Sequence, residues 1–227
     1  HLKTALKLWY TQSISTMTDE DELHIEDFTK KDEKKAIFVI VPPNDSTLTP
    51  IVTLLFSQTV LFLQKKATQE LGGKLPQLLN LLIDELCNIP KIELLGGMTS
   101  VFRGYNIRIT FALQSIARFK QMYKDSWEDI LGNCSIKIYM GSEDITTRKY
   151  VCQDIIGYTT INVENKTYSK GGSSSGGISE GNSPTKRLLI TEDEILELVK
   201  ETNHRGKLVA FLNSPRPLIT WKINIQN

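Results

Sequence analysis

The chain has 227 residues, of which 40% are hydrophobic and 23% are charged, and its formal net charge is +1. These values are ordinary for a soluble globular protein, and the length suits one large α/β domain or one domain with a small appendage. A net charge this close to zero excludes a protein that binds nucleic acid through overall basic charge. Any such contact must rest on local patches or on a ring of subunits. No run approaches the roughly 18 apolar residues of a membrane span, and the N-terminus lacks a signal-peptide pattern.

The cysteines and histidines do not form the patterns that bind metal ions. The three cysteines lie in apolar segments without CxxC spacing, which predicts buried thiols in a reducing compartment rather than a disulfide or a zinc site. The three histidines are equally scattered, so a histidine-based metal site is not expected. These residues are Cys87, Cys134 and Cys152, and His1, His24 and His204. Because the sequence opens on a histidine instead of an initiator methionine, we expect a piece of a longer protein.

The first predicted elements are a helix over residues 2–17 and a solvated acidic connection over 19–27. The apolar run 36–41 predicts a buried strand, which two prolines end. A long helix is then expected to begin at a cap formed by Ser46 or Thr47 and to reach about residue 70, with apolar residues at helical spacing.

Strands and helices alternate in the middle of the chain. The run 78–85 predicts a strand buried on both faces. Further elements are expected in turn: a helix over 91–104, a strand over 106–113, a helix over 116–131, a strand over 135–140, and a helix over 142–156 that Gly157 stops as a left-handed cap. This alternation is typical of a parallel α/β sheet.

The last part of the chain begins with a low-complexity segment. The Gly/Ser-rich run predicts a flexible loop over 169–183. Thr191 and Glu194 form the pattern of a capping box, which predicts a helix to about residue 200. A strand over 207–212 and an edge-like ending over 221–225 follow.

Two adjacent carboxylates, Asp84 and Glu85, close the apolar run of the second predicted strand. The carboxyl ends of strands in a parallel α/β sheet face the ligand crevice, so a charge pair there points at a ligand. The pair has the form of a Walker B element, whose aspartate holds Mg²⁺ through its water shell and whose glutamate orients an attacking water. The alternative is an acidic dipeptide that starts a solvated loop or caps a helix, and the dipeptide alone does not decide between them.

Two further residues fit such a site. Gln114 closes the strand after the carboxylate pair, and neighbouring parallel strands lie about 4.8 Å apart, so Glu85 and Gln114 are expected to reach one water. An uncharged amide can sense a γ-phosphate without competing for Mg²⁺. Arg103, in the preceding helix, can reach a phosphate in a neighbouring subunit as an arginine finger. The alternatives are a helix-start neighbour without a role for Gln114 and a surface salt bridge for Arg103.

A phosphate-binding loop is missing from the sequence. Gly73 and Lys74 resemble the end of such a loop, but Thr68 stands where its first glycine belongs and Leu75 stands where a serine or threonine would bind Mg²⁺. We therefore expect Gly73 and Lys74 to form a turn between helix and strand, and the Walker A element to lie upstream of residue 1.

Several blocks of the sequence resemble the TraG/TraD-like coupling proteins of type IV secretion, the conjugation ATPases. Residues 82–92 (LIDELCNIPKI) are similar to the family's Walker B region, roughly LDEFANIGKI, and residues 102–115 are similar to its SRGYGI…ILQS block. Residues 122–134 resemble YGEDWETILGNC, and shorter matches lie at 36–42 and at 187–195. The blocks run in the family's order over nearly the whole chain.

The resemblance implies an α/β fold, the RecA-like core of a P-loop NTPase with a mostly parallel sheet flanked by helices, from which the N-terminal Walker A part is missing. Residues 1–30 would be a helical segment and connection that end an inserted helical region. Residues 31–227 would be the C-terminal part of the ATPase domain.

The same resemblance implies a homo-hexameric motor that uses ATP and Mg²⁺ to bring a relaxase-bound single DNA strand to the components of a type IV secretion channel. Missing N-terminal helices would hold the full-length protein at the cytoplasmic face of the cell membrane. The sequence given would be a soluble cytoplasmic fragment, inactive as an ATPase by itself.

Carried onto this chain, the resemblance matches Asp84 and Glu85 to the Walker B pair, with Asp84 as the residue toward Mg²⁺ and nucleotide. Gln114 matches the glutamine of the QS block, and Arg103 matches the arginine-finger position. The departures from the family pattern are Leu86 for phenylalanine, Pro90 for glycine and Asn80 within the strand.

Two other functions stay open from the sequence. One is a ring motor of the FtsK or HerA type that acts on duplex DNA, against which the GNC-like block at 132–134 favours a coupling protein. The other is a non-catalytic module for assembly or substrate docking.

Overall fold

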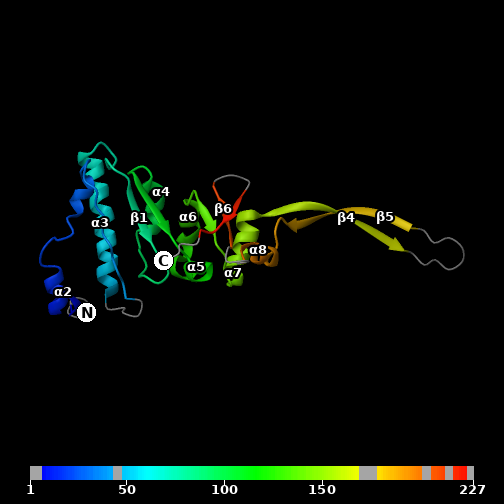
Figure 1. Cartoon of the computed structure of the whole chain (residues 1–227), viewed down its shortest axis with the longest axis horizontal. Coiled ribbons are helices and arrows are strands. Elements are labelled where there is room, and N and C mark those ends of the chain that lie inside the picture. Colours follow the sequence, from blue (N-terminus) through cyan, green and yellow to red (C-terminus); the bar gives the residue numbers. More distant parts are fainter. Residues whose placement is uncertain (1–6, 43–47, 169–177, 201–205, 213–216, 224–227) are drawn as a thin grey trace. The chain divides into compact units, whose positions relative to one another are not determined.

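The computed structural model describes residues 7–42, 48–168, 178–200, 206–212 and 217–223, with the backbone alone for 7–8, 164–168 and 178–182 (Figure 1). The chain divides into two compact units. The first is built from residues 1–114 and 118–133, and the second from residues 115–117 and 134–227. Among the described residues, no helix is long and apolar enough to cross a membrane.

The first unit begins with short helical turns. The 3-10 helix η1 (Lys7–Tyr10) and α2 (Gln12–Met17) are separated by Thr11, whose extended backbone interrupts the single helix predicted over 2–17. A second 3-10 helix, η2 (Ile25–Thr29), lies in the stretch that we expected to be a solvated connection.

The long helix α3 (Thr49–Glu70) confirms the predicted one. Pro50 lies in its first turn, where the missing N–H of proline has no helical partner to lose. Its buried face carries Val60, Leu63 and Ala67, all without solvent exposure and spaced three and four residues apart. The predicted caps Ser46 and Thr47 lie outside the described residues.

A parallel strand pair forms the centre of the first unit. β1 (Leu79–Ile83) and β2 (Ile107–Phe111) pair from Leu79 opposite Ile107 to Ile83 opposite Phe111. α4 (Leu95–Phe102) lies between them in sequence, which makes a β-α-β unit. The helices α5 (Ile116–Tyr123), η4 (Lys124–Ser126) and α6 (Trp127–Gly132) follow β2. The predicted parallel arrangement is confirmed for this pair, and it brings the carboxyl ends of both strands to one edge.

The two faces of this pair differ in burial. Leu79 and Ile107 are buried on the covered face, where Phe119 of α5 stacks on Phe111 of β2 with ring centroids 6.0 Å apart. On the other face, Leu82 is 77% exposed. The prediction that strand 78–85 is buried on both faces is therefore wrong, because the described residues cover only one of them.

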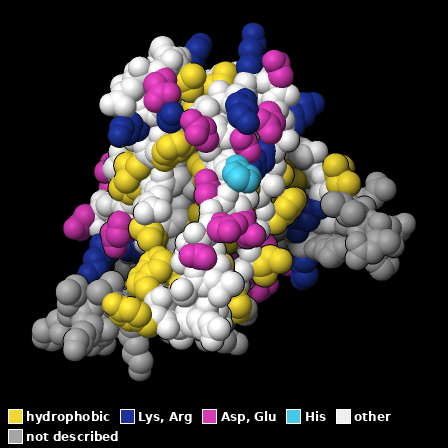
Figure 2. All heavy atoms as spheres, turned by 90° about the vertical axis from the view of Figure 1, so that its left-hand side faces the viewer, with side chains coloured by type: hydrophobic (Ala, Val, Ile, Leu, Met, Phe, Trp, Pro, Cys, Tyr) yellow, Lys and Arg dark blue, Asp and Glu magenta, His cyan; other side chains and the backbone are white. Residues whose placement is uncertain are grey.

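The apolar run 36–41 does not form the predicted strand. It has no regular secondary structure, and Phe38 and Ile40 are 89% and 92% exposed. An apolar run becomes a strand only where neighbouring backbone groups complete its hydrogen bonds, and in the described part of the chain nothing pairs with it. Hydrophobic side chains lie at the surface beside acidic ones on the face shown in Figure 2.

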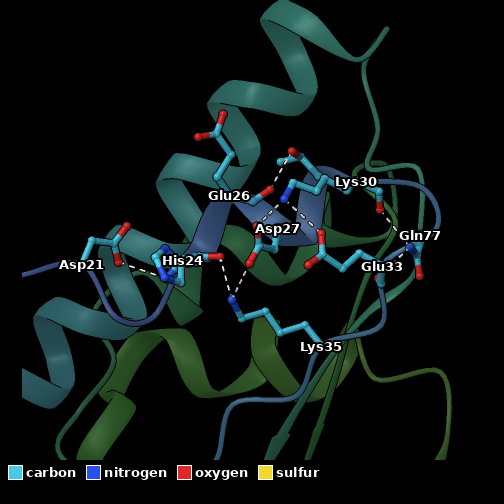
Figure 3. A network of polar contacts seen from close by, with 9 residues as sticks. Asp21, His24, Glu26, Asp27, Lys30, Glu33, Lys35 and Gln77 are labelled. Carbon is cyan, nitrogen blue, oxygen red and sulfur yellow. Dashed lines mark hydrogen bonds and ion pairs between the residues drawn. The ribbon is translucent and has the colours of Figure 1, made fainter.

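A polar cluster ties the connection before α3 to the start of β1 (Figure 3). The Asp27 carboxylate accepts from Lys30 at 2.8 Å and from Lys35 at 2.7 Å. These two ammonium groups lower the pKa of Asp27 to about 2. The side-chain amide of Gln77 donates to the backbone carbonyls of Lys30, Lys31 and Glu33. The acidic connection is therefore held in place by specific contacts.

The second unit contains an antiparallel sheet of order β3-β6-β7. Its strands are β3 (Lys137–Tyr139), β6 (Lys207–Phe211) and β7 (Leu218–Trp221). The alternation of strands and helices had predicted that β3 extends the parallel sheet. Instead, β3 pairs antiparallel with β6. The core beside the sheet comprises Tyr139, Val151, Cys152, Ile195, Val199 and Val209.

Helices of the second unit agree closely with the predicted ones. α7 (Ile145–Lys149) continues into the π-helix η5 (Tyr150–Ile156), which Gly157 ends at φ +86°. The ψ of Gly157 is −155°, outside the left-handed helical region that we predicted, and only glycine adopts this combination easily. α8 (Glu192–Val199) begins at Thr191 with the predicted capping box, which is confirmed.

The second unit also contains a long two-stranded ribbon that the sequence analysis did not predict. β4 (Tyr158–Tyr168) and β5 (Ile178–Leu188) pair antiparallel over eleven residues each, and Figure 1 shows them extending from the helices of the second unit. The predicted loop over 169–183 is therefore wrong for 178–183, which belong to β5. Residues 169–177 of that prediction lie outside the described residues.

Candidate functional site

Because β1 and β2 are parallel, the predicted site residues that follow them lie at one edge of the pair. Asp84 and Glu85 come directly after β1, and Gln114 follows β2 by three residues. The backbone ladder continues past both strands: the N–H of Ala112 donates to the last carbonyl of β1 at 3.0 Å, and the N–H of Leu86 donates to Ala112 at 3.0 Å. Leu86 is fully buried, so the turn after β1 is anchored.

The structure brings Glu85 and Gln114 into direct contact. The side-chain amide nitrogen of Gln114 donates to Oε1 of Glu85. The prediction that these two side chains lie together is confirmed, although they come from positions 29 residues apart. A carboxylate accepts about four hydrogen bonds, so Oε1 keeps a lone pair for a water molecule beside the amide.

Asn88 is a site residue that the sequence reasoning missed. Its side-chain amide donates to Oε2 of Glu85, and its backbone N–H donates to the Glu85 carbonyl at 2.7 Å. Glu85 itself has φ +47°, in the left-handed region that residues with a Cβ rarely adopt. Nothing in the sequence marks this conformation, so the short turn that brings Asn88 back to Glu85 could not be predicted.

The Asp84 carboxylate is exposed, and within the described ranges it has no hydrogen bond or ion pair to another side chain. Mg²⁺ prefers oxygen ligands and is commonly held by one or two carboxylates together with waters and substrate phosphates. A carboxylate that is free of protein partners fits this role. The described residues contain no group of three or more His, Cys, Asp or Glu side chains that could hold a metal ion by themselves.

Arg103 lies at the opposite end of β2. It directly follows α4 and precedes the turn into β2, whereas Gln114 follows the last residue of that strand. A five-residue strand spans roughly 17 Å, so the structure does not bring Arg103 together with Glu85 and Gln114. Arg103 is exposed, and its guanidinium has no partner among the residues that the structure describes. The surface salt bridge that we considered is not formed there.

α5 also supports the turn that carries Glu85. A guanidinium nitrogen of Arg118 donates to the backbone carbonyl of Cys87 at 3.2 Å. Cys87 is buried, and its burial raises the pKa of the thiol. Burial raises the pKa of Cys152 to about 11, so the predicted buried thiols are confirmed at these two positions.

The residues after Gln114 join a second polar network. The Asp144 carboxylate accepts from the hydroxyls of Ser115 at 2.9 Å and Thr147 at 2.6 Å, and from the N–H groups of Thr146 and Thr147. The N–H of Ile116, which opens α5, donates to the buried Thr147 hydroxyl at 3.0 Å. The Thr147 hydroxyl is the first cause of the lowered pKa of Asp144. Asp144 therefore caps α7 and anchors the start of α5 at once.

Comparison with known proteins gives consistent results. The family model described as type IV secretory system conjugative DNA transfer matches residues 1–224. The protein VirD4 of Rhizobium radiobacter is 30% identical over 169 residues, which cover 73% of this chain and 23% of that protein. The conjugal transfer protein TraG of Escherichia coli is 24% identical over 204 residues, or 86% of this chain and 32% of that protein. The matched part of the chain thus spans 23% of the length of VirD4 and 32% of the length of TraG.

A solved structure is similar to this chain over nearly the whole length of this chain. The bacterial conjugative coupling protein TrwBdeltaN70, in a trigonal form in complex with sulphate, matches with a TM-score of 0.58 and 15% sequence identity. The match covers 96% of this chain and 46% of that chain. At this identity the likeness concerns the fold, and it confirms the predicted RecA-like α/β class.

Proposed function

The chain belongs to the type IV secretory system conjugative DNA transfer family, and on that premise we propose that it is the C-terminal part of the ATPase domain of a coupling protein. In this proposal the full-length protein is a hexameric motor at the cytoplasmic membrane. It uses ATP to bring relaxase-bound single-stranded DNA to a type IV secretion channel. Residues 31–227 contribute to the RecA-like core, and residues 1–30 end a helical insertion.

One observation carries the catalytic part of the proposal: Gln114 donates a hydrogen bond to Glu85, and the neighbouring Asp84 carboxylate has no side-chain partner among the described residues. Phosphoryl transfer depends on positioning and on neutralising charge. Asp84 would hold Mg²⁺, which would neutralise the charge that develops on the nucleotide phosphates. Glu85 would orient the attacking water and take up its proton. Gln114 would hold the water or the terminal phosphate through its uncharged amide.

Arg103 is proposed to act on the ATP site of a neighbouring subunit. Its distance from Glu85 along β2 argues against a role at its own site, and its exposed guanidinium has no partner in the described part of the chain. A planar guanidinium matches the oxygens of a transferred phosphoryl group. The phosphate-binding loop and the membrane helices would come from parts of the full-length protein outside this sequence.

The function is tested by separating nucleotide binding from hydrolysis in the full-length protein. Glu85→Gln should keep Mg-ATP binding and lose turnover, because only water activation is removed. Asp84→Ala should weaken binding of Mg-ATP as well. Normal turnover by Glu85→Gln would contradict the catalytic assignment. Stimulation of the wild type by duplex DNA alone would favour a duplex translocase over a coupling protein.

The trans role of Arg103 is tested by mixing subunits. Arg103→Ala and Glu85→Gln proteins should each be nearly inactive, whereas mixed rings should regain partial turnover at interfaces that pair an intact Glu85 with an intact Arg103. Mixed rings no more active than the separate variants would show that Arg103 acts within its own subunit or only in folding.

A further inference from the structure

Asn88 contacts Glu85 in two ways. Its backbone N–H donates to the Glu85 carbonyl at 2.7 Å, and its side-chain amide donates to Oε2 of the same residue. One residue therefore fixes both the backbone turn and the direction of the carboxylate. Asn88 is exposed, so no core packing requires its carboxamide.

The two oxygens of the Glu85 carboxylate are engaged by two different segments. Gln114, after β2, donates to Oε1, and Asn88, after β1, donates to Oε2. With one amide on each side, the carboxylate plane cannot rotate without breaking a bond. Each oxygen still retains acceptor capacity for a water.

The backbone under Glu85 is held in an unfavourable conformation. Residues with a Cβ rarely adopt the left-handed conformation, because the Cβ comes too close to a backbone carbonyl oxygen, and Glu85 has φ +47°. Such a conformation persists only where the surroundings determine it. Here three anchors do so: the Asn88 turn, the buried Leu86 bonded to Ala112, and the Arg118 bond to the carbonyl of Cys87.

From these contacts we propose that Asn88 is a positioning residue for Glu85. It acts through that carboxylate and does not itself touch nucleotide. The inference rests on the proposed function, since it assumes that Glu85 orients the attacking water. Asn88 would keep Oε1 and its lone pair aimed at the edge where Asp84 and Gln114 lie. A displacement of about 1 Å at a reacting group can cost on the order of 100-fold in rate.

The test uses steady-state ATP hydrolysis by the full-length protein. Asn88→Ala should lower kcat by about 10- to 100-fold and change KM by less than about threefold, because positioning for the reaction is lost while nucleotide binding is kept. Asn88→Asp keeps the size and the backbone bond but places a second carboxylate beside Glu85. It should lose at least as much, and it decides the question if Asn88→Ala does not fold.

A matched control is Asn133→Ala. Asn133 is also an exposed asparagine of the first unit, and its amide donates to Thr99 and to the carbonyl of Asp129, away from Glu85. The kcat of Asn133→Ala should stay within about threefold of wild type. This result would show that the loss of an exposed carboxamide elsewhere does not by itself slow hydrolysis.

A double variant shows whether Asn88 acts through Glu85. In the Glu85→Gln background, Asn88→Ala should cause no further loss of turnover, because coupled residues do not add. If Asn88→Ala lowers turnover in the Glu85→Gln background by the same factor as in the wild type, the proposal is overturned. It is also overturned if Asn88→Ala and Asn88→Asp keep a normal kcat while Glu85→Gln is inactive. If Glu85→Gln itself keeps its turnover, the proposed function fails first.

Discussion

Glu85 and Asp144 are two carboxylates with similar partners in very different backbones. Each accepts side-chain hydrogen bonds from a segment far away in sequence, Glu85 from Gln114 and Asp144 from Ser115, both 29 residues apart. Asp144 has an extended backbone with φ −69° and ψ 115°, which is usual before a helix, and it caps α7. Glu85 has φ +47°, and it is not the N-cap of any helix in the described part of the chain.

This difference separates a carboxylate that stabilises the fold from one that does not. A capping carboxylate satisfies N–H groups that a helix leaves unpaired, so its hydrogen bonds contribute to the free energy of folding. The hydrogen bonds to Glu85 instead hold a side chain that caps no described helix, at a residue whose left-handed backbone conformation is unfavourable. A carboxylate kept under such conditions is better explained by chemistry than by stability.

The largest expected effect tests this contrast in catalysis. In the full-length protein, Glu85→Asn should lose about 10²- to 10⁴-fold in turnover, the usual contribution of a group that activates water. Asp144→Asn should lose less than about tenfold, because asparagine also caps helices and Asp144 does not lie among the proposed reacting groups. ATP hydrolysis under saturating Mg-ATP measures both. Similar losses in the two variants would erase the distinction.

The next effect tests the contrast in stability. Asp144→Ala should lower the free energy of unfolding by about 0.5–2 kcal/mol, which corresponds to about 1–8 °C in Tm for a chain of this size. Glu85→Asn should not lower the Tm, because asparagine adopts the left-handed conformation more readily than glutamate. Thermal unfolding of this chain followed by circular dichroism gives both values. A lower Tm for Glu85→Asn than for Asp144→Ala would reverse the comparison.

A pH series sharpens the role of the Asp144 charge. The lowered pKa of Asp144 means that ionised Asp144 stabilises the folded state above the ordinary aspartate pKa, about 3.9. That contribution is lost as the pH falls through the folded-state pKa. Denaturant unfolding should therefore show wild type more stable than Asp144→Asn at neutral pH and equal to it at low pH. For Asp27→Asn the advantage of wild type should persist to about pH 2, since the Asp27 pKa is about 2.

The smallest expected effect concerns the capping box of α8. The Glu194 carboxylate accepts the Thr191 N–H at 2.8 Å and also lies 3.4 Å from Arg187 at an exposed site. Glu194→Gln keeps an acceptor oxygen and loses only the charge, so its loss of stability should be smaller than that of Thr191→Ala. Thr191→Ala removes the cap and should cost about 1 kcal/mol. Equal losses in the two variants, measured by urea unfolding, would show that the charge rather than the cap matters.

The part of the site that the sequence predicted depends on strand ends. Long apolar runs marked β1 and β2, and parallel pairing then placed Glu85 beside Gln114, because parallel neighbours end at one edge. Asn88 escaped prediction because its contact depends on a positive φ at Glu85, which no residue type there signals. A glycine or asparagine at position 85 would have drawn attention to the turn.

The errors in the predicted fold concern which strands pair with one another and which faces of a strand are covered. A single sequence indicates these features only indirectly. The run 36–41 has the composition of a buried strand, yet no described neighbour pairs with it. β3 had the right length and composition, but its partner β6 lies about 70 residues later and runs antiparallel. In β4, the alternation of Ile161 and Val163 with polar residues was a signal for a strand, and the Gly/Ser-rich run that follows drew attention away from it.

The interleaving of the two units limits how the protein can be cut. Residues 115–117 belong to the second unit although the chain on both sides of them builds the first. A fragment that starts at residue 134 would lack the Ser115 hydroxyl bound to Asp144 and the Ile116 N–H bound to Thr147. One cleavage therefore cannot release an intact second unit. Exchanging that unit between relatives would require transplanting both stretches of sequence, 115–117 and 134–227. In a chimera that receives only the later stretch, the start of α7 should be frayed.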